Sequence, residues 1–142
     1  MSVRTSIDIA ASPDDVWAVL SDIQCWPEWT GSVASVTPLD SEPLHVGARA
    51  RVKQPRMPTL VWEVTELTPA RSFTWVARPP GVVATAEHLL SPTGTGGTQV
   101  ELSVTQTGPL AGLAGLLGDR MGRRYVEMEA QGLKRRCEDR PG

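Results

Sequence analysis

Seven short segments that alternate apolar and polar residues, followed by one long segment with helical spacing, constrain this chain most. In the first of them, Val3, Ile7 and Ile9 alternate with charged and polar residues, which is the period of a strand with one buried face. Six more strands are predicted near residues 32–39, 47–54, 60–67, 72–78, 83–91 and 98–107. Because one long helix is the only element left to cover such a sheet, we predict an α+β fold with a seven-stranded antiparallel sheet.

The residues after the first strand carry the signals of a helix start. Ser12 can accept a hydrogen bond from the backbone of the first turn, and Pro13 suits the first helical position. Asp14 and Asp15 lie where the helix dipole favours negative charge. We therefore predict a helix that starts at Ser12, then a second short helix at the Trp-rich turn of residues 26–29.

The long final helix is predicted from about Pro109 to Cys137. One stripe at helical spacing should face the sheet, and it consists of Leu110, Leu113, Leu117, Met121, Tyr125 and Met128. Four glycines lie away from that stripe, and each costs about 0.8–1 kcal/mol relative to Ala. They are Gly112, Gly115, Gly118 and Gly122. We expect the first half of the helix to be weakly held, either as a gate that admits a ligand or as a bent helix entrance without a role.

Length and charge limit the class of protein. With 142 residues, the chain is expected to form one domain over residues 1–138, with a short tail at 139–142. A net charge of −2 with 21% charged residues argues against a strong nucleic-acid or anionic-membrane surface. A local basic cluster interleaves with Ala and Val, as on the solvent face of a half-buried strand. That cluster is Arg49, Arg51, Lys53 and Arg56.

Cysteine usage and apolar runs indicate the compartment. Cys25 and Cys137 lie far apart, match no metal spacing and come without a signal peptide, so we expect a reduced, cytoplasmic setting. The apolar run at residues 110–117 is too short for a bilayer, which takes roughly 20 residues. No transmembrane segment is predicted, and the oligomeric state stays open.

Several short motifs occur in an order that resembles the SRPBCC superfamily. The first is a strand followed by S-P-x-x-V-W-x-x-L-x-D and W-P-x-W. The others are Trp62-Glu63-Val64-Thr65-Glu66-Leu67-Thr68-Pro69, Phe73-Thr74-Trp75, Leu90-Ser91-Pro92, Gly96-Gly97-Thr98-Gln99-Val100 and Gly132-Leu133-Lys134-Arg135. This superfamily includes START-like lipid-transfer domains, birch-pollen-allergen relatives and the polyketide cyclase/dehydrase group. The resemblance implies the helix-grip fold, in which a curved sheet wraps around the helix and a ligand cavity lies between them.

Alternation along the strands predicts which side chains would line that cavity. Trp62, Phe73, Trp75 and His88 share the face assigned to the concave side. Trp brings a broad apolar plate and one N–H group, so Trp62 and Trp75 are candidate pocket walls or plain core residues. From the helix, Met121, Tyr125 and Met128 are added as ligand-binding candidates, although a Met on such a stripe can equally fill a gap in the core.

His88 is the candidate for acid–base chemistry. By parity it points inward, although a hydrogen-bonded core histidine would show the same pattern. His45 lies in a polar loop and is expected to be solvated. Glu66 approaches the concave side only if it keeps the parity of Trp62; otherwise it ends its strand in solvent. No phosphate loop, nucleotide fingerprint, nucleophile elbow or metal spacing occurs in the sequence, so we predict no cofactor and no metal.

Three functions follow as hypotheses. The first is binding, for transport or sequestration, of a small hydrophobic molecule such as a lipid or polyketide. The second is a polyketide cyclase or aromatase that orients its substrate in the cavity and uses His88 to move protons. The third is a protein-interaction or regulatory module, which would use the basic strand face or the glycine side of the last helix.

Overall fold

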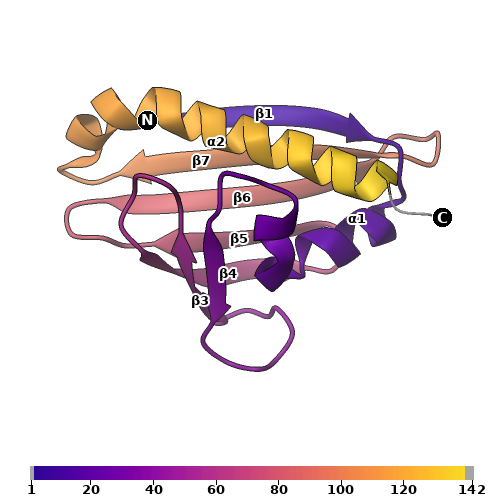
Figure 1. The fold of residues 1–142 in the computed structure, drawn as a ribbon, viewed down its shortest axis with the longest axis horizontal. Coiled ribbons are helices and arrows are strands. Elements are labelled where there is room, and N and C mark those ends of the chain that lie inside the picture. Colours follow the sequence, from indigo (N-terminus) through magenta and orange to yellow (C-terminus); the bar gives the residue numbers. More distant parts are fainter. Residues whose placement is uncertain (1, 140–142) are drawn as a thin grey trace.

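The computed structural model describes residues 2–139, except for the side chains of residues 112–119. Its elements in chain order are β1 (Ser2–Ile9), α1 (Pro13–Leu20), η1 (Ile23–Glu28), β2 (Ser35–Pro38), β3 (Arg49–Lys53), β4 (Leu60–Thr68), β5 (Ser72–Ala77), β6 (Val83–Pro92), β7 (Thr98–Thr107) and α2 (Ala111–Asp139). The predicted seven strands, two short helices and one long helix are confirmed (Figure 1). The helix α2 continues through Asp139, one residue into the expected tail, and residues 140–142 lie outside the description.

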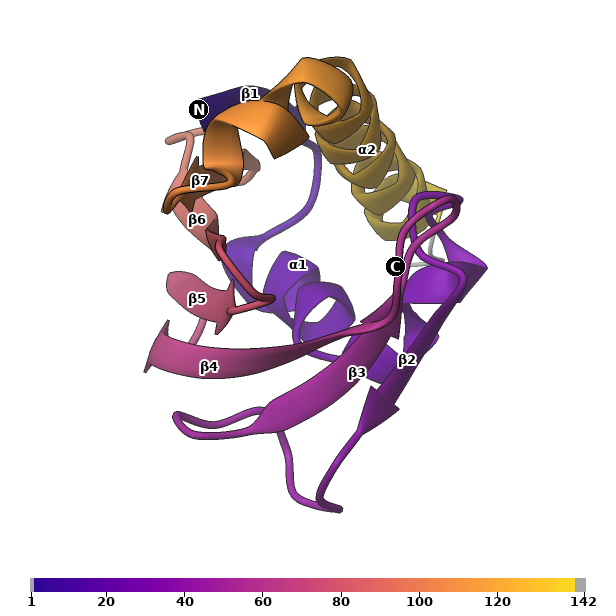
Figure 2. The same ribbon diagram turned by 90° about the vertical axis from the view of Figure 1, so that its left-hand side faces the viewer.

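All neighbouring strands pair antiparallel, in the order β1-β7-β6-β5-β4-β3-β2. The order follows the chain from β2 to β7, and β1 then pairs with the last strand. The sheet curves, and α2 runs along its concave side beside β1 and β7 (Figure 2). This arrangement is the helix-grip fold. No helix in the described part of the chain is long and apolar enough to span a bilayer.

Local signals place the two short helices as predicted. The Ser12 hydroxyl accepts a hydrogen bond from the backbone N–H of Asp15 at 3.2 Å, which satisfies one of the free donors at the start of α1. The short η1 follows at once and carries Trp26, whose indole N–H donates to the Leu20 carbonyl at 3.0 Å. The end of α1 therefore holds this tryptophan in place.

The predicted concave face is buried, and a bulge in β4 decides the position of Glu66. Trp62 and Val64 keep the expected parity, but the register shifts between Val64 and Glu66. Glu66 then lies opposite Thr74, and its side chain is exposed. The bulge inserts one residue and so reverses the faces beyond it. Glu66 therefore ends its strand in solvent and does not approach the concave side, which confirms that alternative of the prediction.

The buried side of α2 differs from the predicted stripe. Leu110 precedes the helix and is 50% exposed, so its predicted packing against the sheet is wrong. Met121, Tyr125 and Met128 are half-buried. Among the described positions of α2, the buried ones are Ala111, Val126, Ala130, Gly132, Leu133 and Cys137. Small and β-branched residues there let the helix lie close to β1, a packing that apolar periodicity alone does not reveal.

Of the four glycines predicted to lie away from the sheet, Gly122 is the one among the described positions. A Cβ on Gly122 would lie 3.5 Å from Val3 Cγ2, so Gly122 faces the sheet, and its predicted placement away from the sheet is wrong. The other predicted positions lie outside the described side chains, and they are Gly112, Leu113, Gly115, Leu117 and Gly118. The gate hypothesis rests on them and stays a hypothesis.

Candidate functional site

An aromatic cluster surrounds His88 on the concave face. Phe73 and His88 are partners across β5 and β6, and their rings stack with centroids 4.0 Å apart. Trp75 packs on both, with centroids 5.4 Å from Phe73 and 6.1 Å from His88. Trp62 lies 5.7 Å from Trp75 on the other side. The sheet therefore brings together the four strand residues that the sequence predicted, and all four are buried.

Trp26 lies within the same cluster, although sequence reasoning gave it no place there. Its ring centroid lies 5.3 Å from Trp75, 5.7 Å from His88 and 5.7 Å from Trp29. Face parity could not assign it, because η1 is a short 3-10 helix with neither the period of a strand nor a full amphipathic turn. Its hydrogen bond to the Leu20 carbonyl fixes the ring against the sheet.

Hydrogen bonding orients the imidazole of His88. Its Nδ1 lies 3.1 Å from the Phe73 carbonyl oxygen. A carbonyl only accepts, so Nδ1 carries a hydrogen and donates it. The second ring nitrogen, Nε2, lies 3.5 Å from Oε1 of Glu129. His88 is thus held on one side by the sheet and faces a carboxyl group of α2 on the other.

Glu129 is the functional candidate that the sequence reasoning missed. Its side chain is 15% exposed and that of His88 4%, and its Oε1 is buried without a hydrogen-bond partner among the described residues. A separation of 3.5 Å is within ion-pair reach but long for a hydrogen bond. The two groups attract each other only when a proton is on Nε2 or on the carboxyl group, because the Nε2 lone pair would otherwise face a carboxylate.

The signal that could have found Glu129 is its spacing from buried residues of the same helix. It stands four residues before Leu133, which is fully buried, and directly before the buried Ala130. Exposed neighbours such as Glu127 hide that spacing in the sequence. An acidic residue at this position of an amphipathic helix indicates a polar partner inside the protein, because burying a carboxylate is costly unless it is paired.

The helix residues predicted for the site reach the loops beside it. The Tyr125 hydroxyl donates to the Pro55 carbonyl in the β3–β4 loop, so this hydroxyl already has a partner. The Met128 Cε lies 3.2 Å from the position of a Cβ on Gly31, in the η1–β2 loop. Met121 is half-buried. Their role toward a ligand stays a prediction.

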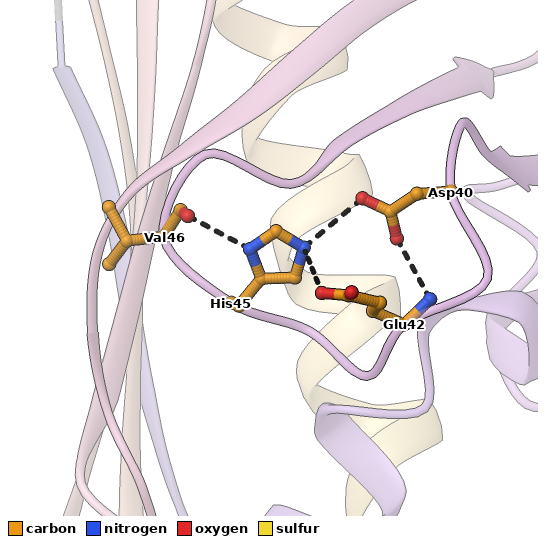
Figure 3. Close-up of polar contacts among 4 residues, drawn as sticks. All are labelled: Asp40, Glu42, His45 and Val46. Atoms are coloured by element: carbon orange, nitrogen blue, oxygen red, sulfur yellow. Dashed lines mark hydrogen bonds and ion pairs between the residues drawn. The ribbon is translucent and has the colours of Figure 1, made fainter.

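His45, the other histidine, lies in the β2–β3 loop, where it is half-buried and has partners (Figure 3). Its Nδ1 lies 2.9 Å from the Val46 carbonyl oxygen, and its Nε2 3.1 Å from Asp40 and 3.6 Å from Glu42. The Val46 carbonyl, followed by Asp40, raises the pKa of His45 above 6.5. The expectation of a simply solvated histidine is therefore incomplete.

A separate hollow of about 430 Å³ lies beside the C-terminal part of α2 and is lined in part by Cys25, Asp22 and Trp29. Hydrogen bonding to Asp22, followed by desolvation and by Glu28, raises the pKa of Cys25 to about 11. The thiol is thus held in its unreactive, protonated form at neutral pH. This hollow holds none of the residues predicted for ligand binding.

Comparisons with known proteins agree with this architecture. The protein TTHA0849 from Thermus thermophilus superposes with a TM-score of 0.77 at 22% identity, covering 96% of this chain and 97% of that one. A START superfamily protein from Mycobacterium smegmatis gives 0.79 at 15% identity, with 96% and 97% covered. The Zhui aromatase/cyclase from Streptomyces sp. R1128 gives 0.74 at 19% identity, with 97% and 93% covered. These likenesses show the fold.

Sequence relatives cover less of the chain. An uncharacterized protein of Mycobacterium tuberculosis (strain H37Rv) is 36% identical over 44 residues, which is 31% of this chain and 26% of that protein. The chain thus matches about a quarter of the length of such curated relatives. A family model described as "Polyketide cyclase / dehydrase and lipid transport" matches residues 1–138. Because that match spans nearly the whole sequence, this chain belongs to the polyketide cyclase/dehydrase and lipid transport family.

Proposed function

We propose that this protein binds a small, mostly apolar molecule between the concave face of the sheet and α2, for transport or sequestration. The observation that carries the proposal is the polar pair His88–Glu129, set among aromatic rings. A core needs no such pair, since a buried carboxyl oxygen without a hydrogen-bond partner costs about 1–3 kcal/mol or more. A ligand hydroxyl placed there would donate to that oxygen and satisfy it.

The walls around this pair suit an apolar body. Trp62, Phe73 and Trp75 offer flat ring surfaces, and burying ligand area against them yields roughly 25 cal/mol per Å². His88 and Glu129 would orient the polar end. Small-molecule sites commonly combine mostly apolar walls with a few polar groups in this way.

Native mass spectrometry of the chain purified gently from its own cells tests the proposal. We expect a reproducible small-molecule adduct on the intact mass that is absent from the denatured chain. His88→Gln should weaken ligand binding up to about tenfold, since losing a hydrogen bond costs about 0.5–1.5 kcal/mol. His45→Gln is the matched control, because the only other histidine lies in the β2–β3 loop, and it should leave binding unchanged.

Two results would contradict the proposed binding function. A ligand that binds His88→Gln and Trp75→Ala as tightly as the wild type would exclude this site. A chain without an adduct, which also fails to bind fatty acids and polyketide mimics at micromolar concentration, would exclude the function.

Catalysis is a second candidate, and the proximity of Glu129 to His88 favours it. A carboxyl group 3.5 Å from an imidazole nitrogen supports general acid–base chemistry on a bound carbonyl compound. In a cyclase, such a pair would take a proton from the carbon between two carbonyls and return one to an oxygen. His88→Ala would then keep substrate binding and lose turnover of a poly-β-ketone, and full activity in that variant would refute the role.

A further inference from the structure

One end of the molecule gathers arginines that lie far apart in the sequence. Strand pairing defines this end: β2 starts where β3 ends (Ser35 opposite Lys53), and β6 starts where β7 ends (Val83 opposite Thr107). The loops there span residues 29–34, 54–59, 78–82 and 108–110. The 78–82 and 108–110 loops and the start of α2 lie at the left in Figure 1, whereas the 54–59 and 29–34 loops lie farther along α2. We call this surface, together with the exposed side of α2 at residues 120–124, the arginine end.

None of those four loops contains an Asp or Glu. The exposed arginines of this surface are Arg56, Arg78, Arg120, Arg123 and Arg124. Among the described residues, the ion pairs formed by Lys and Arg involve Arg4, Lys134 and Arg136, and none involves these five. On α2, Asp119 precedes Arg120 in the sequence and the exposed Glu127 follows Arg124, so these two acidic residues stand against the five arginines. The surface is therefore strongly cationic on a chain whose net charge is −2.

The fold holds part of this surface in place. The Tyr125 hydroxyl donates to the Pro55 carbonyl, and Lys53 Nζ donates to the Met57 carbonyl. Both contacts flank Arg56, which has a φ of 65°, a conformation that non-glycine residues rarely adopt. The β3–β4 loop, which carries Arg56, is thus tied to α2 at Tyr125, the residue after Arg124.

Exposed apolar side chains lie at the same end. Leu110 is 50% exposed and Val83 36%. The backbone N–H of Leu110 donates to the Gly81 carbonyl at 2.9 Å, which joins the β7–α2 and β5–β6 loops. Cations next to exposed aliphatic groups match the charged headgroups and the acyl boundary of an anionic bilayer.

We propose that the arginine end docks on a membrane surface that contains anionic lipids. A bilayer fits better than single-stranded nucleic acid, whose binding surfaces present aromatic rings to the bases, because Trp26, Trp29, Trp62 and Trp75 are buried. A bilayer also fits better than an acidic protein surface, because the exposed Leu110 and Val83 have apolar counterparts in the acyl boundary of a membrane. Docking goes beyond the proposed function and does not depend on it.

Vesicle co-sedimentation of the full chain tests the proposal, with an equal mixture of phosphatidylglycerol and phosphatidylcholine against phosphatidylcholine alone. We expect binding to the anionic vesicles only, and weaker binding as salt is added. Arg56→Gln with Arg123→Gln should lower partitioning about 25-fold, at about fivefold for each arginine near the surface. Arg71→Gln with Arg135→Gln is the matched control, because both are exposed arginines toward the opposite end, and it should change partitioning less than about twofold.

Leu110→Ser provides a test at constant charge, and we expect it to weaken vesicle binding severalfold while thermal unfolding stays cooperative. Three results would each overturn the proposal. The first is equal binding to neutral and anionic vesicles, and the second is an equal loss of vesicle binding in the two double variants. The third is binding to RNA or to an acidic protein without binding to vesicles. Native mass spectrometry of the Arg56/Arg123 double variant separates the two proposals. An adduct that persists while vesicle binding is lost supports docking as a distinct property.

Discussion

Gly132→Ala tests how closely α2 packs on the chain after η1. A Cβ on Gly132 would lie 2.0 Å from the Trp29 carbonyl oxygen and 3.0 Å from its carbon. The atoms met are backbone, so no rotamer change relieves the clash, and α2 or the loop must move by about 1 Å. Overpacking of this kind costs about 1–3 kcal/mol, and we take the upper end because Leu133 beside it is fully buried.

The helix itself favours the substitution, and the net value has to include that. Replacing Gly by Ala inside a helix gains about 1 kcal/mol. We therefore expect Gly132→Ala to lower the free energy of unfolding by about 2 kcal/mol, which for a chain of this length lowers Tm by about 4–8 °C. Urea unfolding followed by circular dichroism, with thermal unfolding beside it, measures both.

Gly122→Ala is the matched control on the same helix. Its new Cβ would lie 3.5 Å from Val3 Cγ2, which is ordinary contact, so the propensity gain of about 0.8–1 kcal/mol should appear as added stability. Opposite signs at the two positions are the expected result. A neutral or stabilising Gly132→Ala would refute the close approach of α2 to Trp29.

Three further predictions concern titration and reactivity. Hydrogen bonding from Lys134, and then from the Ala10 N–H, lowers the pKa of Glu138 below 4.5. The contribution of Glu138 to stability is therefore present above that pH and is lost as the pH falls through the lowered pKa. In urea titrations, the stability difference between the wild type and Glu138→Gln should shrink from neutral pH to about pH 3. The raised pKa of His45 gives the opposite pH dependence. The contribution of His45 to stability is present below pH 6.5 and is lost as the pH rises through the raised pKa. The stability of His45→Asn should therefore approach that of the wild type between about pH 6 and pH 8. Cys25, with a pKa of about 11, should react with iodoacetamide at about pH 8 roughly a hundredfold more slowly than a free cysteine peptide, and peptide mapping that showed equal rates would contradict this.

Much of the fold follows from local patterns. Alternation assigned Phe73, Trp75 and His88 to the concave face because successive side chains of a strand point to opposite sides. Ser12 and Pro13 marked the start of α1 because capping is a contact within one turn. Such signals need no partner from elsewhere in the chain.

The open and the wrong predictions have an equally physical origin. Parity alone left the side of Glu66 open, and the bulge in β4 turned its side chain to solvent. Leu110 matched a helical stripe but stands before the helix. Periodicity describes an element as if it continued regularly, whereas bulges and helix ends depend on what the element packs against.

The sequence by itself determined the elements, their order and the face of the sheet that carries His88, because these depend on residues a few positions apart. Only the tertiary structure decided that Glu129 meets His88, that Trp26 joins the aromatic cluster, and that Tyr125 bonds Pro55 of the β3–β4 loop. Each of these pairs links elements separated by tens of residues. Their proximity is set by the curvature of the sheet and the path of α2 along it, and no local pattern encodes either.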